Sequence, residues 1–302
     1  MNNENSPFRL ENDSLYKRWR DKKLHDYPSS LDELIVEIND PKRLTSSEHQ
    51  KLLNICAKAN MVIYKSQMGA DDDQNIPLML GEQFGLKRLD HNMLSEKSGL
   101  SALTVDKAKG LRGYIPYSNR SLQWHTDGYY NTPDHQIHSI LLHCVQSAQS
   151  GGDNQLLDHE IAYLLLRDKN PDFIKALMQK DVMTIPARME DGKVARAEET
   201  GPVFSIDSDT GNLHMRFTIR KRHVIWKEDD LTTQARQALF EILNDSASPY
   251  IFNGRLESGM GLLCNNVLHD RTGFNDDENH RRILYRARYF DRVHETDVAM
   301  LG

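Results

Sequence analysis

Residues Trp124 to Tyr130 read Trp-His-Thr-Asp-Gly-Tyr-Tyr, with His125 and Asp127 two positions apart. On an extended strand this spacing sends both side chains to the same face. One imidazole and one carboxylate on the same face are two of the three ligands of a facial metal site. Such a pair also arises by chance in a chain with 13 histidines. The metal interpretation therefore depends on a second histidine and an anion-binding arginine further along the chain.

The second histidine is His269, in a segment from Cys264 to Arg271 that reads Cys-Asn-Asn-Val-Leu-His-Asp-Arg. It lies far downstream of His125, so only the fold can bring the two together. Two histidines and one carboxylate leave the opposite face of a metal open, which is typical of non-haem Fe(II) oxygenases. A histidine at a strand end, satisfied by hydrogen bonds, is the simpler interpretation of His269 taken alone.

The arginines come next, in a segment ending at Arg286 that reads Arg-Arg-Ile-Leu-Tyr-Arg. On a strand, Arg282, Leu284 and Arg286 share one face. The planar guanidinium group suits a carboxylate or a sulfonate, so two such groups beside a metal can hold two separate anions. The alternative is the charged outer face of an edge strand, which we expect to explain Arg281 and Arg288 in part.

Taken together, these motifs resemble the taurine dioxygenase family of Fe(II)/2-oxoglutarate-dependent oxygenases, relatives of clavaminate synthase. Trp124–Asp127 resembles the family's first metal motif, and Asn265–Phe274 resembles the second. The turn Gly151–Asn154 resembles the one that contributes a contact to the cosubstrate. Arg282 and Arg286 fall where the family has two arginines. The resemblance extends from about residue 30 to about residue 292.

The resemblance implies an α+β fold, with a distorted double-stranded β-helix (jelly roll) core flanked by helices. It implies a dioxygenase that couples decarboxylation of 2-oxoglutarate to oxidation of a C–H bond, most simply a hydroxylation. Fe(II) would be held by His125, Asp127 and His269, with 2-oxoglutarate and dioxygen as cosubstrates. The substrate would be a small, anionic or amino-acid-like molecule.

By the same resemblance, Asn154 and Arg282 bind 2-oxoglutarate and Arg286 contacts the substrate. The family often has Thr at the position of Asn154, but an asparagine also hydrogen-bonds a carboxylate. Related halogenases carry Ala or Gly where this chain has Asp127, so the chain is expected to oxygenate its substrate. The residues of the substrate pocket match no pattern that implies taurine itself.

Two other functions are compatible with these residues. A zinc-dependent hydrolase can use the same His/Asp/His site with a metal-bound water as nucleophile, and oxygen consumption would distinguish it. That interpretation gives Arg282 and Arg286 no role. A non-catalytic jelly-roll binding protein would bind no redox metal and would tolerate replacement of the three metal-site residues.

Composition sets broader limits. The chain has 302 residues, of which 38% are hydrophobic and 27% charged, which favours a globular protein. Its net charge of −6 gives no support to a nucleic-acid-binding surface. No apolar run reaches the length of a membrane span, and the N-terminus has no apolar secretory core. The three cysteines are widely spaced, which suits the cytoplasm. A monomer and a homo-oligomer are both compatible with the sequence.

Residues 1–30 are polar and charged, which predicts a loosely ordered arm with a helix around Leu15–Arg20. Residues 31–302 are then expected to form one domain. Thr45 to Glu48 reads Thr-Ser-Ser-Glu, a capping box that opens a helix. The apolar run Ile137–Val145 predicts a central strand.

A hairpin is expected from Val203–Ile206 and Leu213–Ile219. Arg216, Arg220, Lys221 and Arg222 make its second half basic; such a run is usually solvated, but alternating members could face a cleft that receives an anion.

Overall fold

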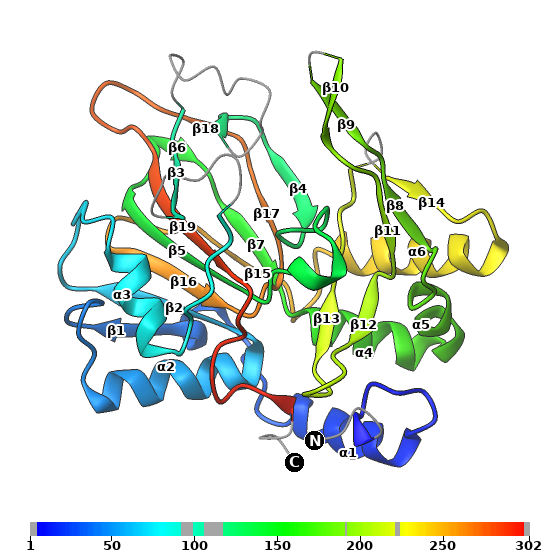
Figure 1. Ribbon diagram of the computed structural model, residues 1–302. Coiled ribbons are helices and arrows are strands. Elements are labelled where there is room, and N and C mark those ends of the chain that lie inside the picture. The colour runs from blue at the N-terminus through cyan, green and yellow to red at the C-terminus, as the bar shows by residue number, and fades with distance from the viewer. Residues whose placement is uncertain (1–4, 92–98, 106–116, 191, 221–223, 299–302) are drawn as a thin grey trace.

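Two β-sheets face each other and enclose the interior of the molecule (Figure 1). This computed structural model describes residues 5–91, 99–105, 117–190, 192–220 and 224–298. The larger sheet contains, in spatial order, β1 (Ile35–Ile38), β2 (Met61–Ser66), β16 (Met260–Cys264), β5 (Ser139–Gln146), β19 (Ile283–Tyr289) and β3 (Ser101–Leu103). The facing sheet contains β15 (Phe252–Gly254), β7 (Asn154–Leu157), β17 (Leu268–Arg271) and β4 (Leu122–His125). The arrangement confirms the predicted α+β fold with a jelly-roll core.

The predicted central strand is β5, which pairs with β16 on one side and β19 on the other. Most residues of β5 are buried whichever face of the sheet they point to, because both faces are covered. Helix α2 (Ser46–Ala59) and helix α3 (Ile76–Gln83) cover the outer face, on the left of Figure 1. Helix α2 begins with the predicted capping box: Thr45 accepts a hydrogen bond from the Glu48 backbone, and the Glu48 carboxylate accepts one from Thr45.

The register aligns one row of side chains across the large sheet. Residues in directly paired positions point to the same side of a sheet. The row consists of Arg286, Leu142, Leu262 and Ile63, each paired with the next.

A second row crosses the smaller sheet. It consists of His125, His269, Leu156 and Phe252, again each paired with the next. Members of both rows line one pocket, so the two rows face each other across the interior. The sheet registers therefore bring the predicted histidines opposite the face that carries Arg286.

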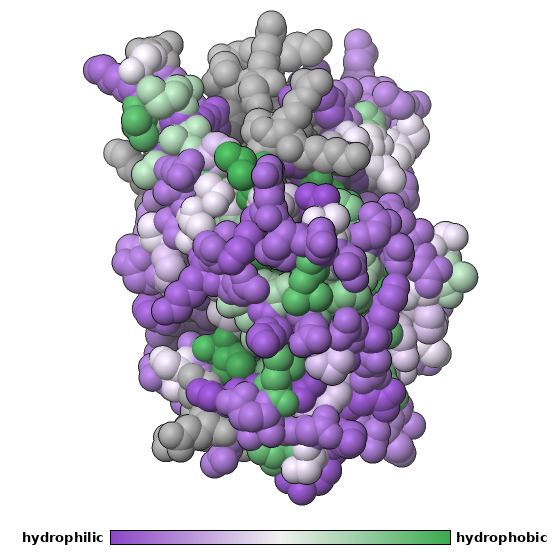
Figure 2. All heavy atoms as spheres, turned by 90° about the vertical axis from the view of Figure 1, so that its right-hand side faces the viewer, coloured by the Kyte–Doolittle hydropathy of each residue, from purple (hydrophilic) through white to green (hydrophobic). Residues whose placement is uncertain are grey.

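Smaller strands and three helices complete the molecule, and most of them lie in the right-hand part of Figure 1. Strands β6 (Ser150–Gly151) and β18 (Phe274–Asn275) lie at its upper left. The other strands are β8 (Met183–Ile185), β9 (Arg188–Glu190), β10 (Lys193–Arg196), β11 (Glu199–Gly201), β12 (Phe204–Ile206), β13 (Leu213–Met215) and β14 (Ile225–Trp226). The helices are α4 (His159–Lys169), α5 (Pro171–Leu177) and α6 (Asp230–Leu243). Strands β12 and β13 pair as the predicted hairpin. Hydrophilic side chains cover most of this side of the molecule, with small separate apolar groups between them (Figure 2).

The N-terminal segment differs from the expected loose arm. It forms helix α1 (Asp13–Leu24), and Phe8, Tyr16 and Trp19 pack in the same core cluster as Tyr163 of α4. Lys23, fully buried, makes ion pairs of 2.7 Å with two carboxylates at the start of α4. A polar segment is thus fixed by a few large aromatic groups and one buried cation. The boundary between an arm of residues 1–30 and a single domain of residues 31–302 stays a prediction.

None of the helices in the described ranges combines the length and the apolar character needed to cross a bilayer.

Candidate active site

His125, Asp127 and His269 lie together in the interior. Their candidate ligand atoms are all within 4.8 Å of one another. The two imidazole rings are 4.2 Å apart between centroids, and His125 Nε2 is 3.6 Å from Asp127 Oδ1. Strand β4 ends at His125, and Asp127 follows in a turn. Thr126 between them is buried and hydrogen-bonds the backbone of Phe217.

Both histidines are fixed by hydrogen bonds within their own segments. The Nδ1 atom of His125 lies 2.9 Å from the carbonyl oxygen of Gln123, and that of His269 lies 2.9 Å from the carbonyl oxygen of Val267. A carbonyl oxygen only accepts, so Nδ1 carries the proton in each ring. The lone pair of Nε2 is therefore available to a metal in both histidines, as is usual for metal-ligating histidines.

The charge of Asp127 is stabilised by Arg286. Burial alone would raise the pKa of Asp127, but the Arg286 guanidinium holds it well below its ordinary range. Arg286 Nη1 lies 3.0 Å from Asp127 Oδ2. Burial and the neighbouring His125 lower the pKa of His269 to about 4. At neutral pH Asp127 is therefore a carboxylate and His269 a neutral imidazole. Together with His125 they make up the two-histidine, one-carboxylate donor set that divalent iron takes in a facial site.

Asn266 joins the two metal-site motifs and was not singled out in the sequence. Its Oδ1 accepts a 2.8 Å hydrogen bond from the backbone N–H of Asp127. Its Nδ2 donates to the carbonyl oxygens of Asp127, at 2.9 Å, and of Ile137, at 2.7 Å. The residue has φ +52°, a conformation that asparagine adopts more readily than most residues. Asn266 follows Asn265 and lies three residues before the candidate ligand His269. This Asn-Asn pair is the one signal in the sequence that could have indicated that Asn266 links the two motifs.

Replacing Asn266 by glycine should destabilise the protein and weaken metal binding. Glycine keeps the positive φ, so the change removes only the amide and leaves buried backbone groups unsatisfied, at a cost of roughly 1–3 kcal/mol or more. Thermal unfolding and Mn(II) titration measure the two effects. Asn54→Ala, on the exposed face of α2, is the control. Equal behaviour of the two variants would show that Asn266 does not hold the site together.

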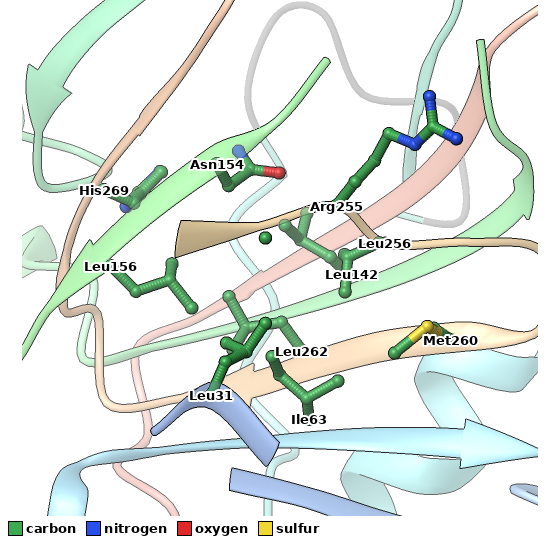
Figure 3. A pocket seen from close by; sticks show the side chains of 11 residues that line it. Leu31, Ile63, Leu142, Asn154, Leu156, Arg255, Leu256, Met260, Leu262 and His269 are labelled. Carbon is green, nitrogen blue, oxygen red and sulfur yellow. The ribbon is translucent and has the colours of Figure 1, made fainter. Parts of the chain in front are cut away.

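Asn154 and His269 lie on one side of a pocket between the two sheets (Figure 3). The rest of the pocket is mostly apolar, with Leu142, Leu156 and Leu262 contributed by both sheets. Asn154 Nδ2 donates a 2.6 Å hydrogen bond to the Asp270 carbonyl oxygen, next to His269. This bond fixes the amide beside the trio and leaves its Oδ1 toward the pocket.

Arg282 lies apart from the trio, just before β19. Its guanidinium group is 5.2 Å from the centre of the Phe274 ring, and Nη1 is buried without a hydrogen-bond partner among the described residues. Burial lowers the pKa of Arg282. Gly152 (φ +79°) packs against it, since a Cβ there would lie 3.5 Å from Arg282 Nε. A buried guanidinium with a free donor is suited to an anionic ligand.

Arg288 is not part of a charged outer face, contrary to the expectation for this strand. Strand β19 pairs with β3 along one edge and with β5 along the other, so it is not an edge strand. Arg288 is buried and hydrogen-bonds both Asp90 and the Tyr130 hydroxyl. The sequence gives no local sign of these partners, because Asp90 and Tyr130 lie far from Arg288 along the chain.

Comparison with known proteins adds a family and a fold. The sequence model described as "Taurine catabolism dioxygenase TauD, TfdA family" matches residues 25–288. A uridine-5′-phosphate dioxygenase from Amycolatopsis sp. is 31% identical over 173 residues, which are 55% of this chain and 60% of that protein. The match thus spans less than two thirds of that relative.

Solved structures with a similar fold are non-haem iron oxygenases. An asparagine oxygenase in complex with Fe(II), 3-hydroxyasparagine and succinate superposes with a TM-score of 0.59 at 13% identity, covering 82% of this chain and 80% of that one. The oxygenase OrfP with Fe, succinate and (3S)-hydroxy-L-Arg gives 0.60 at 14% identity, covering 82% of each chain. At 13% and 14% sequence identity, the similarity to these structures shows a shared fold.

Proposed function

The chain belongs to the TauD/TfdA family, and from this premise we propose that it is an Fe(II)- and 2-oxoglutarate-dependent dioxygenase that hydroxylates a small anionic substrate. The observation that carries the proposal is the trio His125, Asp127 and His269, whose ligand atoms lie within 4.8 Å of one another. Both imidazoles present Nε2, and one side of the trio adjoins the pocket. These residues fit an iron ion with open coordination positions.

The site residues then divide into metal ligands and residues that bind the cosubstrate. His125, Asp127 and His269 would hold Fe(II), and Asn154 and Arg282 would bind 2-oxoglutarate. When bound, Fe(II) with 2-oxoglutarate and dioxygen supplies the oxidising power for the C–H bond. The chain itself fixes the imidazoles through backbone carbonyls, keeps the carboxylate ionised and surrounds the site with apolar leucines that restrict water.

Arg286 would contact the substrate beside the iron site, because it reaches Asp127 from the large sheet. The relatives support a small substrate: one is named for a nucleotide, and two structures hold hydroxylated amino acids. The nucleotide carries a phosphate, and both amino acids carry a carboxylate. A small anionic molecule is therefore the partner we propose, rather than nucleic acid or a membrane.

Succinate formation should depend on Fe(II), 2-oxoglutarate and dioxygen, and a true substrate should stimulate it. The assay covers amino acids, sulfonates, small carboxylates and uridine 5′-monophosphate, with oxygen uptake followed in parallel. Mass spectrometry should show a product that has gained oxygen, even with chloride present, because Asp127 would hold the iron at the position that a halide would otherwise take. Zinc-dependent hydrolysis of a substrate without oxygen uptake would contradict the proposed reaction.

A cytoplasmic location is part of the proposal. Cys56, Cys144 and Cys264 are all buried and unpaired. Free thiols persist in a reducing compartment.

A further inference from the structure

Arg271 is buried at the end of β17, the strand that carries the second candidate histidine. Its Nη2 donates hydrogen bonds to the carbonyl oxygens of Ser118, at 2.8 Å, and of Arg120, at 2.6 Å. The carbonyl oxygen between them, that of Asn119, accepts a 3.1 Å hydrogen bond from the backbone N–H of Phe274. Three consecutive carbonyl groups thus fix the positions of both Arg271 and Phe274.

The Phe274 ring connects Arg271 to Arg282. The guanidinium carbon of Arg271 lies over this ring at 4.9 Å from its centre, and that of Arg282 lies over it at 5.2 Å. Phe274 is held on the other side by Gly151, its partner in the pairing of β18 with β6. A Cβ on Gly152 would lie 3.5 Å from Arg282 Nε and 3.6 Å from Phe274 Cβ. The two buried cations therefore share one ring, which the surrounding backbone holds in place.

The positive charges of Arg271 and Arg282 are not balanced within the described part of the chain. Arg286 and Arg288, on strand β19, each form a salt bridge with a carboxylate. Arg271 and Arg282 form none with the described residues, and each has a buried nitrogen without a hydrogen-bond partner there, Nε in Arg271 and Nη1 in Arg282. Two like charges repel more strongly in a buried position than in water, so an anion bound beside them stabilises both.

Arg216 shows how a buried arginine of this chain is satisfied without an anion. All three of its guanidinium nitrogens donate hydrogen bonds, to the carbonyl oxygens of Tyr129, Met183, Gly201 and Glu199. Arg271 and Arg282 lack such a complete set of acceptors. Of the rest of the basic run expected after β13, Arg220 is half-buried, and Lys221 and Arg222 lie outside the described residues.

We propose that Arg271 is a positioning residue for the distal carboxylate of 2-oxoglutarate, the group that Arg282 would contact. The inference rests on the proposed dioxygenase function. Arg271 acts in two ways: it fixes the ring on which the Arg282 guanidinium lies, and it adds a second positive charge near the bound carboxylate. Its own hydrogen bonds go to backbone carbonyls, so it attracts the anion through charge and needs no contact with it.

Titration with two oxo acids in the presence of Mn(II) tests this role without turnover. 2-Oxopentanoate has the length of 2-oxoglutarate and its metal-binding end, but a methyl group replaces the distal carboxylate. Arg271→Gln should raise the dissociation constant of 2-oxoglutarate roughly threefold to tenfold, because a nearby charge is lost. The same change should leave the dissociation constant of 2-oxopentanoate as in the wild type. Arg271→Lys keeps the charge and should retain most of the affinity for 2-oxoglutarate.

Arg120→Gln is the matched control, because Arg120 is an exposed arginine whose backbone carbonyl binds Arg271. It loses the same charge and should bind both acids like the wild type. Phe274→Leu removes the shared ring and should show the same selective loss of 2-oxoglutarate affinity as Arg271→Gln, which provides a second test if the latter does not fold.

Equal weakening of both acids in the Arg271→Gln and Phe274→Leu proteins would indicate a structural role only and would overturn the inference. Unchanged affinity of both variants for 2-oxoglutarate would overturn it as well. A wild-type chain that bound Mn(II) but neither oxo acid would instead contradict the dioxygenase function itself. Thermal unfolding of each variant shows whether the fold is retained.

Discussion

The His269→Ala protein is expected to lose its iron site. Loss of a residue that only orients a metal ligand already weakens metal binding by about 10–100-fold, so loss of a ligand should cost more. With Fe(II) and 2-oxoglutarate under anaerobic conditions, the wild-type protein should show a weak visible charge-transfer band. The variant should lack that band and all 2-oxoglutarate-dependent succinate formation.

His135→Ala is the matched control, because His135 is an exposed histidine on a nearby turn. It should keep the band and the activity. Circular dichroism and thermal unfolding of both variants distinguish loss of the ligand from loss of the fold. An unchanged band in a folded His269→Ala protein would remove His269 from the site and leave His125 and Asp127 without a third ligand.

The parts of the fold that sequence predicted are those with local causes. The helix opened by Thr45 and Glu48 follows from a reciprocal hydrogen bond within four residues, and the central strand follows from the apolar run that begins at Ile137. The three candidate ligands were also predictable, because two of them lie two residues apart. Their roles stay predictions, but their convergence is a property of the structure.

The unpredicted parts depend on contacts between distant segments. The order of residues 5–30 comes from Phe8, Tyr16 and Trp19, and each such ring buries about 150–250 Å². In a segment that is otherwise polar, three aromatic residues do not change the local pattern. The pairing of Arg288 with Asp90 and the role of Asn266 likewise depend on residues brought together only by the sheets.

Arg282 and Arg286 illustrate the limit of the strand pattern. Alternation predicts that they share a face, about 13 Å apart at roughly 3.3 Å per residue. The pairing of β19 with β5 shifts its register between Ile283 and Leu284, so Arg282 lies before an irregularity and Arg286 after it. Arg282 packs on Phe274, whereas Arg286 reaches Asp127. The two guanidinium groups thus have different surroundings, which predicts different ligands.

Replacing Arg282 by alanine should raise the dissociation constant of 2-oxoglutarate at least tenfold. A contact between a guanidinium and a carboxylate is worth on the order of 1.5–3 kcal/mol, and more where the partner charge stays buried. Nη1 of Arg282 has no hydrogen-bond partner among the described residues, so the bound anion would supply one. Arg286 already has a carboxylate partner in Asp127, so Arg286→Ala should leave 2-oxoglutarate binding nearly unchanged and weaken substrate-stimulated turnover.

Titration of both variants with 2-oxoglutarate, in the presence of Mn(II), measures the difference directly. Arg281→Ala is the control, since Arg281 is exposed and adjacent to Arg282, and removing its charge should leave the affinity as in the wild type. If Arg286→Ala loses the cosubstrate while Arg282→Ala keeps it, the two roles are reversed. The charge of Asp127 would then be neutralised by Arg286 only until the cosubstrate arrives, and the buried guanidinium beside Phe274 would serve the substrate instead.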